Sequence, residues 1–162
     1  MDIELTYDML GNRLRAIGGV PIMYSHRLSD QPRTLGPWSL KYDMLGTRLR
    51  AVGSTEITYG RWGNLPRTVG PWTCDYRKFG NQLVRLGPHE LTYYRLGNRV
   101  RTLGPLEISY GRLGNQPRRV QWPGESESLP DDLLLALFLV LYWKEEEQEE
   151  ESMADARRRR GW

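Results

Sequence analysis

The stretch Thr55-Glu-Ile-Thr-Tyr-Gly-Arg-Trp-Gly-Asn-Leu-Pro-Arg-Thr-Val-Gly-Pro71 is one of seven copies of a short unit. Each copy carries one tyrosine, and successive tyrosines are 17, 18, 17, 17, 17 and 17 residues apart: Tyr7, Tyr24, Tyr42, Tyr59, Tyr76, Tyr93 and Tyr110. A fixed period over about 120 residues indicates a repeat architecture. Repeats that pack against their neighbours are typical of scaffolds and binding surfaces.

Each unit contains two runs of about five β-forming residues, separated by two kinds of turn. One turn is centred on Gly-Asn, as at Gly63-Asn64 and Gly97-Asn98, and both residue types tolerate positive φ. The other begins with glycine, as at Gly36-Pro37 and Gly70-Pro71, and suits a type II′ hairpin. Every unit is therefore predicted to form a β-hairpin.

Side-chain alternation predicts the two faces of the hairpin. If the loop is the three residues 62–64, Tyr59 lies opposite Arg67 and Ile57 opposite Val69. The repeat then places Ile or Leu, Tyr, Arg and Val on one face, and Glu56 with threonines on the other. This pattern is typical of antiparallel strands with one buried side.

Seven hairpins supply about fourteen strands, and an open sheet of that size would expose two edges and a large apolar face. We therefore expect an all-β fold over residues 1–121, in which the hairpins close into an antiparallel barrel or shell. Closure at a radius of roughly 14 Å leaves a central space about one helix wide.

The remaining chain is predicted to be a linker (122–128), an apolar helix with an acidic run (129–151) and a disordered basic tail (152–162). Residues 133–143 are apolar on every side of a helix, which predicts burial all round. The run could fill the barrel in cis, dock on a partner or mediate self-association. A membrane anchor is a weaker alternative, because eleven residues fall short of the roughly twenty that a span needs. For the basic tail, a role at nucleic acid or an anionic surface is the alternative to a solvated segment.

Charge divides the chain. Residues 1–124 carry a net +9 and residues 125–162 a net −6, which sum to the formal +3 of the whole chain. A single cysteine, Cys74, cannot form an intrachain disulfide, and the N-terminus has no secretory pattern, so a cytoplasmic location is expected.

The sequence offers little for catalysis. His26 and His89 occupy non-equivalent positions, and His89 falls on the predicted inner face, where packing is the simpler interpretation. No metal-ligand spacing, nucleophile–base pairing or phosphate-binding glycine loop is found. We therefore expect a non-enzymatic protein without a cofactor or a membrane span.

Two functions are consistent with these features. The first is a protein-interaction or scaffold module, with a protein partner or self-association, whose C-terminal helix plugs the repeat domain. The alternative is a module that binds an anionic ligand or nucleic acid through the Tyr/Arg face. In the simpler interpretation, each arginine stacks on a tyrosine and bonds backbone carbonyls at the rim. The candidate ligand-binding residues are Arg15, Arg33, Arg50, Arg67, Arg101 and Arg118, with Tyr7, Tyr24, Tyr42, Tyr59, Tyr93 and Tyr110.

Two units carry a more specific pattern, Tyr-Asp-Met-Leu-Gly followed by Asn-Arg-Leu at 12–14 or Thr-Arg-Leu at 47–49. In these units the sequence resembles the YD repeat of Rhs-type proteins. That resemblance implies β-hairpins that assemble into a shell around a polypeptide. Elsewhere the Asp is replaced, and the chain is much shorter than a typical shell, so the resemblance implies enclosure but not toxin delivery.

Overall fold

The structure, a computed structural model, describes residues 1–8, 13–25, 31–44, 48–60, 65–111, 116–126 and 128–160. The chain divides into two compact units, Met1–Leu129 and Pro130–Trp162. The Gly-Asn and equivalent turns of the first four units and of the seventh, together with His26, lie outside the described residues.

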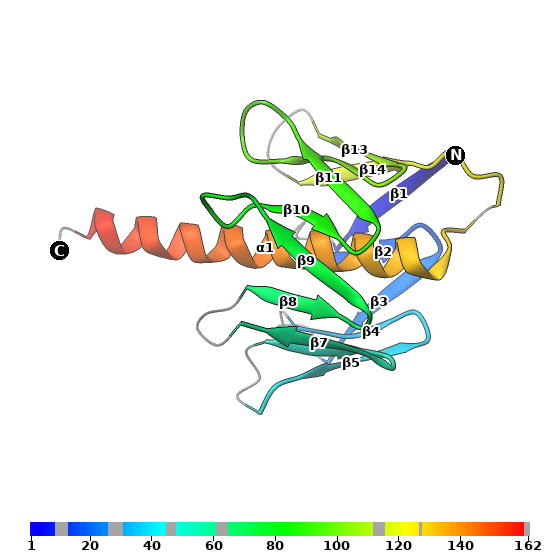
Figure 1. The fold of residues 1–162 in the computed structure, drawn as a ribbon, viewed down its shortest axis with the longest axis horizontal. Coiled ribbons are helices and arrows are strands. Elements are labelled where there is room, and N and C mark those ends of the chain that lie inside the picture. The colour runs from blue at the N-terminus through cyan, green and yellow to red at the C-terminus, as the bar shows by residue number, and fades with distance from the viewer. Residues whose placement is uncertain are drawn as a thin grey trace. The chain divides into compact units, whose positions relative to one another are not determined.

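The first unit is a closed antiparallel barrel of fourteen strands, which confirms the predicted fold class (Figure 1). Each strand pairs with its neighbours in sequence, and β1 pairs with β14. The strands are β1 (Asp2–Tyr7), β2 (Leu14–Ile17), β3 (Val20–Tyr24), β4 (Pro32–Leu35), β5 (Trp38–Tyr42), β6 (Leu49–Val52), β7 (Thr55–Tyr59), β8 (Pro66–Val69), β9 (Trp72–Tyr76), β10 (Leu83–Leu86), β11 (His89–Tyr93), β12 (Val100–Leu103), β13 (Leu106–Tyr110) and β14 (Pro117–Gln121).

The seam of the barrel lies between β1 and β14, which are not joined by a short turn. Ile3 pairs with Val120, and Glu4 pairs with Arg119. Beyond the ladder, Trp122 N–H donates to the Met1 carbonyl at 2.9 Å, and the Met1 ammonium donates to the Trp122 carbonyl at 2.6 Å. These contacts complete the ring and leave no sheet edge.

The glycine-first turns have the geometry that a type II′ hairpin requires. In all six, the glycine has φ between 55° and 58°: Gly18, Gly36, Gly53, Gly70, Gly87 and Gly104. Four of these glycines are followed by proline, whose φ is restricted to about −65°. At the other rim, Gly97 (φ 88°) and Asn98 (φ 50°) show the positive φ predicted for the Gly-Asn turn.

The inner wall is apolar, as predicted from the alternation. Its buried side chains include Ile3, Leu5, Ile17, Ile22, Leu35, Leu40, Val52, Ile57, Val69, Leu86, Leu91, Leu103, Leu106, Ile108 and Val120. The predicted polar face is also confirmed, because its glutamates Glu4, Glu56, Glu90 and Glu107 are exposed. His89 is buried and packs edge-on against Trp72 at 5.4 Å between ring centroids, as expected of a packed histidine.

The predicted strand register is correct in the middle of the hairpin but wrong at the tyrosine. Ile57 does lie opposite Val69, but Tyr59 lies opposite Pro66 instead of Arg67. The hairpin closes through Gly60 N–H to the Leu65 carbonyl at 3.3 Å, so the loop between this pair has four residues instead of three. The arginine is therefore the extra residue of a β-bulge, and the residue before it takes the buried place.

The same bulge recurs around the barrel. In each hairpin the register shifts between the tyrosine and the residue before it. One residue of the second strand therefore has no pairing partner in the ladder. That residue is Arg15, Arg33, Arg50, Arg67, Arg101 or Arg118, and Val84 in the fifth unit. The predicted placement of these arginines on the buried face was wrong, because all six are exposed.

The second unit contains one helix, α1 (Asp131–Arg159). It includes the predicted apolar and acidic segments but continues beyond residue 151. The expected disordered tail is therefore helical as far as Arg159. Acidic residues in the first turn and arginines in the last turn complement the helix dipole, which favours this extension. Within the described part of the chain, no helix combines the length and apolarity that a membrane crossing needs.

Candidate functional site: the tyrosine and arginine rim

The seven period-marking tyrosines form a closed ring of hydrogen bonds, which we call the tyrosine ring. Each hydroxyl donates to a backbone carbonyl of the preceding hairpin, as in Tyr24 to Leu14 (2.9 Å), Tyr42 to Pro32 (2.6 Å) and Tyr59 to Leu49 (2.5 Å). Tyr76, Tyr93 and Tyr110 bond Pro66, Leu83 and Val100 in the same way. Tyr7 closes the ring through the Pro117 carbonyl at 2.7 Å.

The bulge explains why these hydrogen bonds are needed. Neighbouring hairpins pair near the glycine-first turns, as at Ala51–Glu56 and Val52–Thr55, but their ladder does not reach the loop rim. The carbonyl of Leu49, next to the bulged Arg50, is thus available to accept from the next hairpin. The tyrosine hydroxyl spans this gap, so the ring holds the hairpins together where backbone pairing ends.

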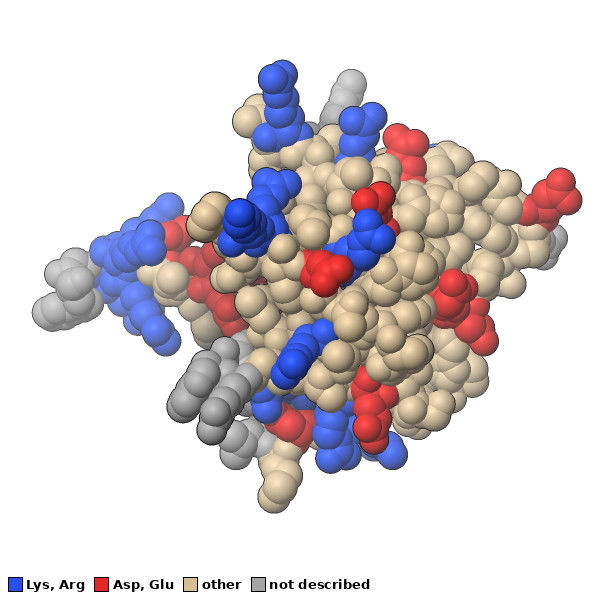
Figure 2. Space-filling view, in the orientation of Figure 1, with Lys and Arg blue, Asp and Glu red and all other residues tan. Residues whose placement is uncertain are grey.

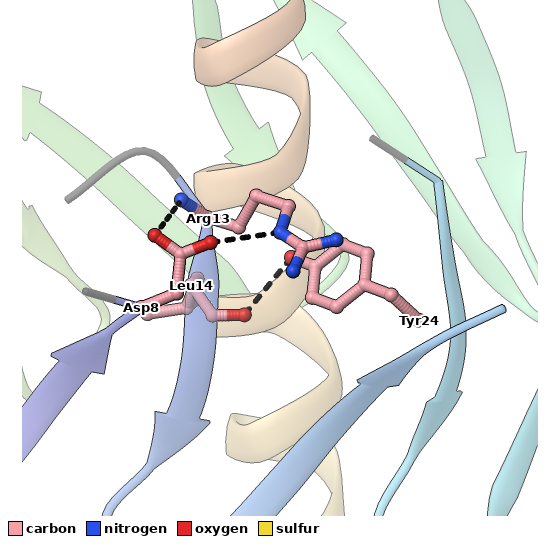
Figure 3. A network of polar contacts seen from close by, with 4 residues as sticks. All are labelled: Asp8, Arg13, Leu14 and Tyr24. Atoms are coloured by element: carbon pink, nitrogen blue, oxygen red, sulfur yellow. Dashed lines mark hydrogen bonds and ion pairs between the residues drawn. The ribbon is translucent and has the colours of Figure 1, made fainter. Parts of the chain in front are cut away.

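In the first unit an ion pair lies next to a tyrosine of the ring (Figure 3). Arg13 Nε is 2.8 Å from Asp8 Oδ2, and the guanidinium carbon lies 4.4 Å from the centroid of the Tyr24 ring. Asp8 N–H also donates to the Arg13 carbonyl at 2.9 Å. One arginine is therefore held by a carboxylate of its own loop and stacks on the tyrosine of the next hairpin.

The third unit repeats the arrangement with Asp43, Arg48 and Tyr59, at 3.0 Å for the ion pair and 4.7 Å for the stacking distance. These are the two units in which the YD-like pattern is complete. In the sixth unit, Tyr94 replaces the aspartate, and Arg99 lies 5.3 Å from its ring and 5.1 Å from that of Tyr110. Tyr94 meets Tyr110 edge-on and donates to the Ile108 carbonyl at 2.9 Å.

The six predicted arginines do not lie together on the buried face. Two of them stack on rim tyrosines, Arg118 on Tyr7 at 5.7 Å and Arg101 on Tyr94 at 5.7 Å. Arg50 instead lines an open depression of about 530 Å³ on the barrel wall, together with Lys41 and Glu56. The structure therefore brings all the predicted tyrosines together and spreads the predicted arginines over exposed positions.

The rim arginines Arg13, Arg48 and Arg99 were missed by the sequence reasoning. Each follows the Gly-Asn or Gly-Thr turn directly, so the repeat does carry a signal for them. The prediction of a three-residue loop placed a different arginine opposite the tyrosine, the one two residues later in the sequence. The arginine directly after the turn was therefore not considered as its partner. Asp8 and Asp43 are marked in the same way by the YD-like pattern.

Burial keeps two phenols of the ring, those of Tyr76 and Tyr110, protonated. Burial, followed by the neighbouring Tyr94, raises the pKa of Tyr110 from 10.0 to about 12, against the opposing effect of Arg99. Burial also raises the pKa of Tyr76, with smaller contributions from Cys74, Tyr59 and Tyr93. Raised values oppose formation of a phenolate nucleophile, and they suit hydroxyls that act as hydrogen-bond donors.

Tyr59→Phe is expected to destabilise the barrel by about 1 kcal/mol, because the Leu49 carbonyl loses its donor while the ring packing is kept. Urea unfolding followed by circular dichroism would measure the loss. The control is Thr92→Val, which removes an exposed hydroxyl bonded to Thr102 and should cost less than about 0.5 kcal/mol. An equal loss of unfolding free energy in the two variants would mean that the Tyr59 hydroxyl does not hold neighbouring hairpins together.

Cys74 lies on the inner side of β9, opposite Leu86. Burial, with a smaller contribution from Asp75, raises the pKa of its thiol from 9.0 to about 11. Iodoacetamide alkylation of the native protein should therefore rise with a midpoint near pH 11, and with a midpoint near 9 in urea. Because the folded state holds the proton more tightly, Cys74 should also lower stability progressively as pH rises from about 9 to about 11. A native alkylation midpoint near 9 would contradict this environment.

Across the described residues, no group of three or more His, Cys, Asp and Glu side chains could hold a metal ion. What the rim offers is hydrogen-bond donors committed to backbone carbonyls, together with fixed guanidinium groups. This arrangement can hold hairpins together and attract anions.

Comparison of the chain with protein-family models, with curated proteins and with solved structures found no match.

Proposed function

We propose that the protein is a non-enzymatic interaction or scaffold module whose barrel encloses an apolar helix, and that α1 of the same chain is that helix. The proposal rests on two apolar surfaces, the inner wall of the barrel and the first part of α1, each of which is stable only when shielded from water. The barrel has an apolar inner wall, with a buried apolar side chain on thirteen of its fourteen strands and the half-buried Trp72 and Cys74 on β9. Residues 133–143 of α1 are apolar on every side. Burying both surfaces together is the largest favourable term available to the chain.

The dimensions support this pairing. Fourteen strands close at a radius of roughly 14 Å and leave a space about 10 Å wide, the diameter of one helix. Eleven helical residues extend about 16 Å, the length of a five-residue strand. An enclosed helix of this length would be covered along its whole apolar segment.

The direction of the chain supports the same arrangement. β14 ends at Gln121, at the rim of the glycine-first turns, where it pairs with Asp2. A helix that entered there would carry its acidic run, residues 145–151, toward the loop rim and its arginines Arg13, Arg48 and Arg99. The net charges of the two parts, +9 and −6, have the signs that this meeting requires.

Full-length variants test the proposal. Leu137→Asp places a carboxylate in the middle of the apolar run, and an enclosed helix should then be expelled, giving increased binding of a hydrophobic dye and self-association. Met153→Asp is the matched control, because Met153 lies on the same helix, beyond the apolar run, and is 65% exposed. Identical dye binding and size for the two variants would refute the enclosed helix.

A chain ending at Gly124 provides a second test. It should aggregate or melt well below the full chain, and a peptide of residues 129–151 added in trans should restore its melting temperature. A truncated chain that stays monomeric, equally stable and unable to bind hydrophobic dyes would exclude α1 as the plug and return it to the alternatives of partner docking or self-association.

A second function, binding of an anionic ligand or nucleic acid, is favoured by one arrangement. Lys41 and Arg50 share the open depression, and the other bulge arginines are exposed at equivalent places. Binding of a fluorescent oligonucleotide should then weaken steeply with salt and strengthen when residues 145–151 are deleted. Binding that is unchanged by the deletion, or absent at low salt, would leave only the scaffold function.

A further inference from the structure

The loops of the hairpins lie at one rim of the barrel and the glycine-first turns at the other, because antiparallel strands reverse direction at each connection. Two adjacent loops are described in full. Each is closed by a backbone hydrogen bond, Arg77 N–H to the Gln82 carbonyl and Tyr94 N–H to the Arg99 carbonyl, both 2.8 Å. Gln82 Nε2 donates to Asn98 Oδ1 at 2.6 Å, so the two loops are linked to one another.

Each of these loops presents a large apolar side chain to solvent. Phe79 is 88% exposed and Leu96 is 81% exposed, and both precede the loop glycine directly. Packing within the barrel therefore does not account for them. The sequence has Leu, Trp or Phe before the loop glycine in six units: Leu10, Leu45, Trp62, Phe79, Leu96 and Leu113. In the two loops that the structure describes this residue is exposed, and exposed apolar side chains next to one another indicate a contact outside the chain.

Cations flank both apolar side chains. Arg77, Lys78 and Arg95 are exposed, and neither residues 77–82 nor residues 94–99 include an acid. We define the loop patch as Arg77, Lys78, Phe79, Arg95 and Leu96. It combines two exposed apolar side chains with three positive charges.

Exposed acids lie near the opposite rim, close to the glycine-first turns, on four strands: Asp2, Glu4, Glu56, Glu90 and Glu107. In Figure 2, acidic side chains lie in the middle of the visible face and toward its right, while most lysines and arginines lie toward its left. Arg85 forms an ion pair with Glu90 and Arg119 lies opposite Glu4, but the acids outnumber these cations. An anionic surface would therefore attract the loop patch more strongly than the turn rim.

We propose that the loop patch docks the barrel on an anionic lipid surface, with Phe79 and Leu96 entering the headgroup region and Arg77, Lys78 and Arg95 contacting lipid phosphates. Apolar side chains surrounded by cations have the chemistry of peripheral membrane binding, in which shallow burial and attraction to anionic lipid add together. If α1 fills the barrel as proposed above, its acidic run would lie at this same rim and oppose the attraction, so deleting residues 145–151 should strengthen the binding.

Single-stranded nucleic acid is the other polyanion that could meet such a rim, but the patch suits it less well. Base recognition on a protein surface relies on aromatic side chains for stacking, and Phe79 is the aromatic member of the patch. Leu96 has no ring to stack on a base, whereas an acyl chain can bury it. Its exposure beside Arg95 therefore favours lipid.

The test is co-sedimentation of the full chain with vesicles of phosphatidylcholine alone and of phosphatidylcholine with 30% phosphatidylserine, a composition on the order of anionic inner leaflets. We expect binding to the anionic vesicles, weakened about tenfold or more in the double variant Phe79→Ser/Leu96→Ser. Met23→Ser is the apolar control, because Met23 is 58% exposed on strand β3, away from the loop patch. It should bind as the unmodified protein does.

Charge is tested by Lys78→Glu/Arg95→Glu against Arg85→Glu/Arg119→Glu, which reverses two exposed arginines on strands β10 and β14, outside the loop patch. The first pair should lose about tenfold more affinity than the second. Absence of vesicle binding, or equal binding by the Phe79→Ser/Leu96→Ser variant and the unmodified protein, would overturn the proposal. A patch-dependent affinity for oligo(dT) without vesicle binding would overturn it in favour of nucleic acid.

Discussion

Val120→Asp is expected to unfold the barrel or to reduce its free energy of unfolding by at least about 4 kcal/mol. Val120 has no exposed surface and pairs with Ile3 across the seam and with Ile108 on β13. A carboxylate at this position would be removed from water without a cationic partner on the inner wall. The seam is sensitive because strand pairing, without a short connecting turn, closes the ring there.

Urea unfolding measured by circular dichroism and tryptophan fluorescence would quantify the loss. Ser109→Asp is the matched control, since it introduces the same carboxylate at an exposed place on β13, opposite Arg119. It should change stability by less than about 0.5 kcal/mol. If Val120→Asp were equally mild, the seam would not be a buried part of a closed barrel.

Gly87→Ala is expected to cost about 3 kcal/mol, the second largest effect. Gly87 has φ +58°, a region that costs an L-residue roughly 1–2 kcal/mol. An added Cβ would also lie 2.4 Å from Cγ of Trp72, so the indole or the turn must move. The expected result is a lower urea midpoint with an unchanged slope.

Variants at two other turn glycines separate the cost of the positive φ from the cost of the clash with Trp72. Gly70→Ala has nearly the same φ, +56°, but a milder approach of 3.1 Å to Thr55 Cγ2, and should cost about 1–2 kcal/mol. Gly19→Ala has no atom within 4 Å and no positive φ, and should be neutral within about 0.5 kcal/mol. A Gly87→Ala variant no worse than Gly70→Ala would mean that Trp72 does not pack against the turn.

The sequence predicted the wall of the barrel because the wall repeats a local pattern. Ile57, Val69 and their equivalents alternate with polar residues, and alternation within one strand assigns them to the inner face. The turn glycines were predicted for the same reason, since positive φ is a property of the turn itself. Closure of the barrel was predicted because an open sheet of fourteen strands would leave two strand edges unpaired.

The arginine register was mispredicted because a bulge leaves no mark in the period. Adding one residue to every return strand keeps the units equally spaced, yet it moves Arg67 out of the wall and Pro66 into it. The bulge also changed which arginines belong to the candidate site. Arg13, Arg48 and Arg99 stack on the tyrosines in place of the arginines that the sequence had suggested, apart from Arg101 and Arg118.

By itself the sequence determined that seven hairpins exist, where they turn and which of their faces is apolar, because these properties depend on residues close together in one strand or one turn. The tertiary structure alone decided that β1 meets β14, that arginine is the bulged residue and that each tyrosine hydroxyl reaches a carbonyl of the preceding hairpin. The last of these joins Tyr7 to Pro117, 110 residues apart. Such contacts depend on how neighbouring hairpins approach one another, and a local periodicity carries no record of that geometry.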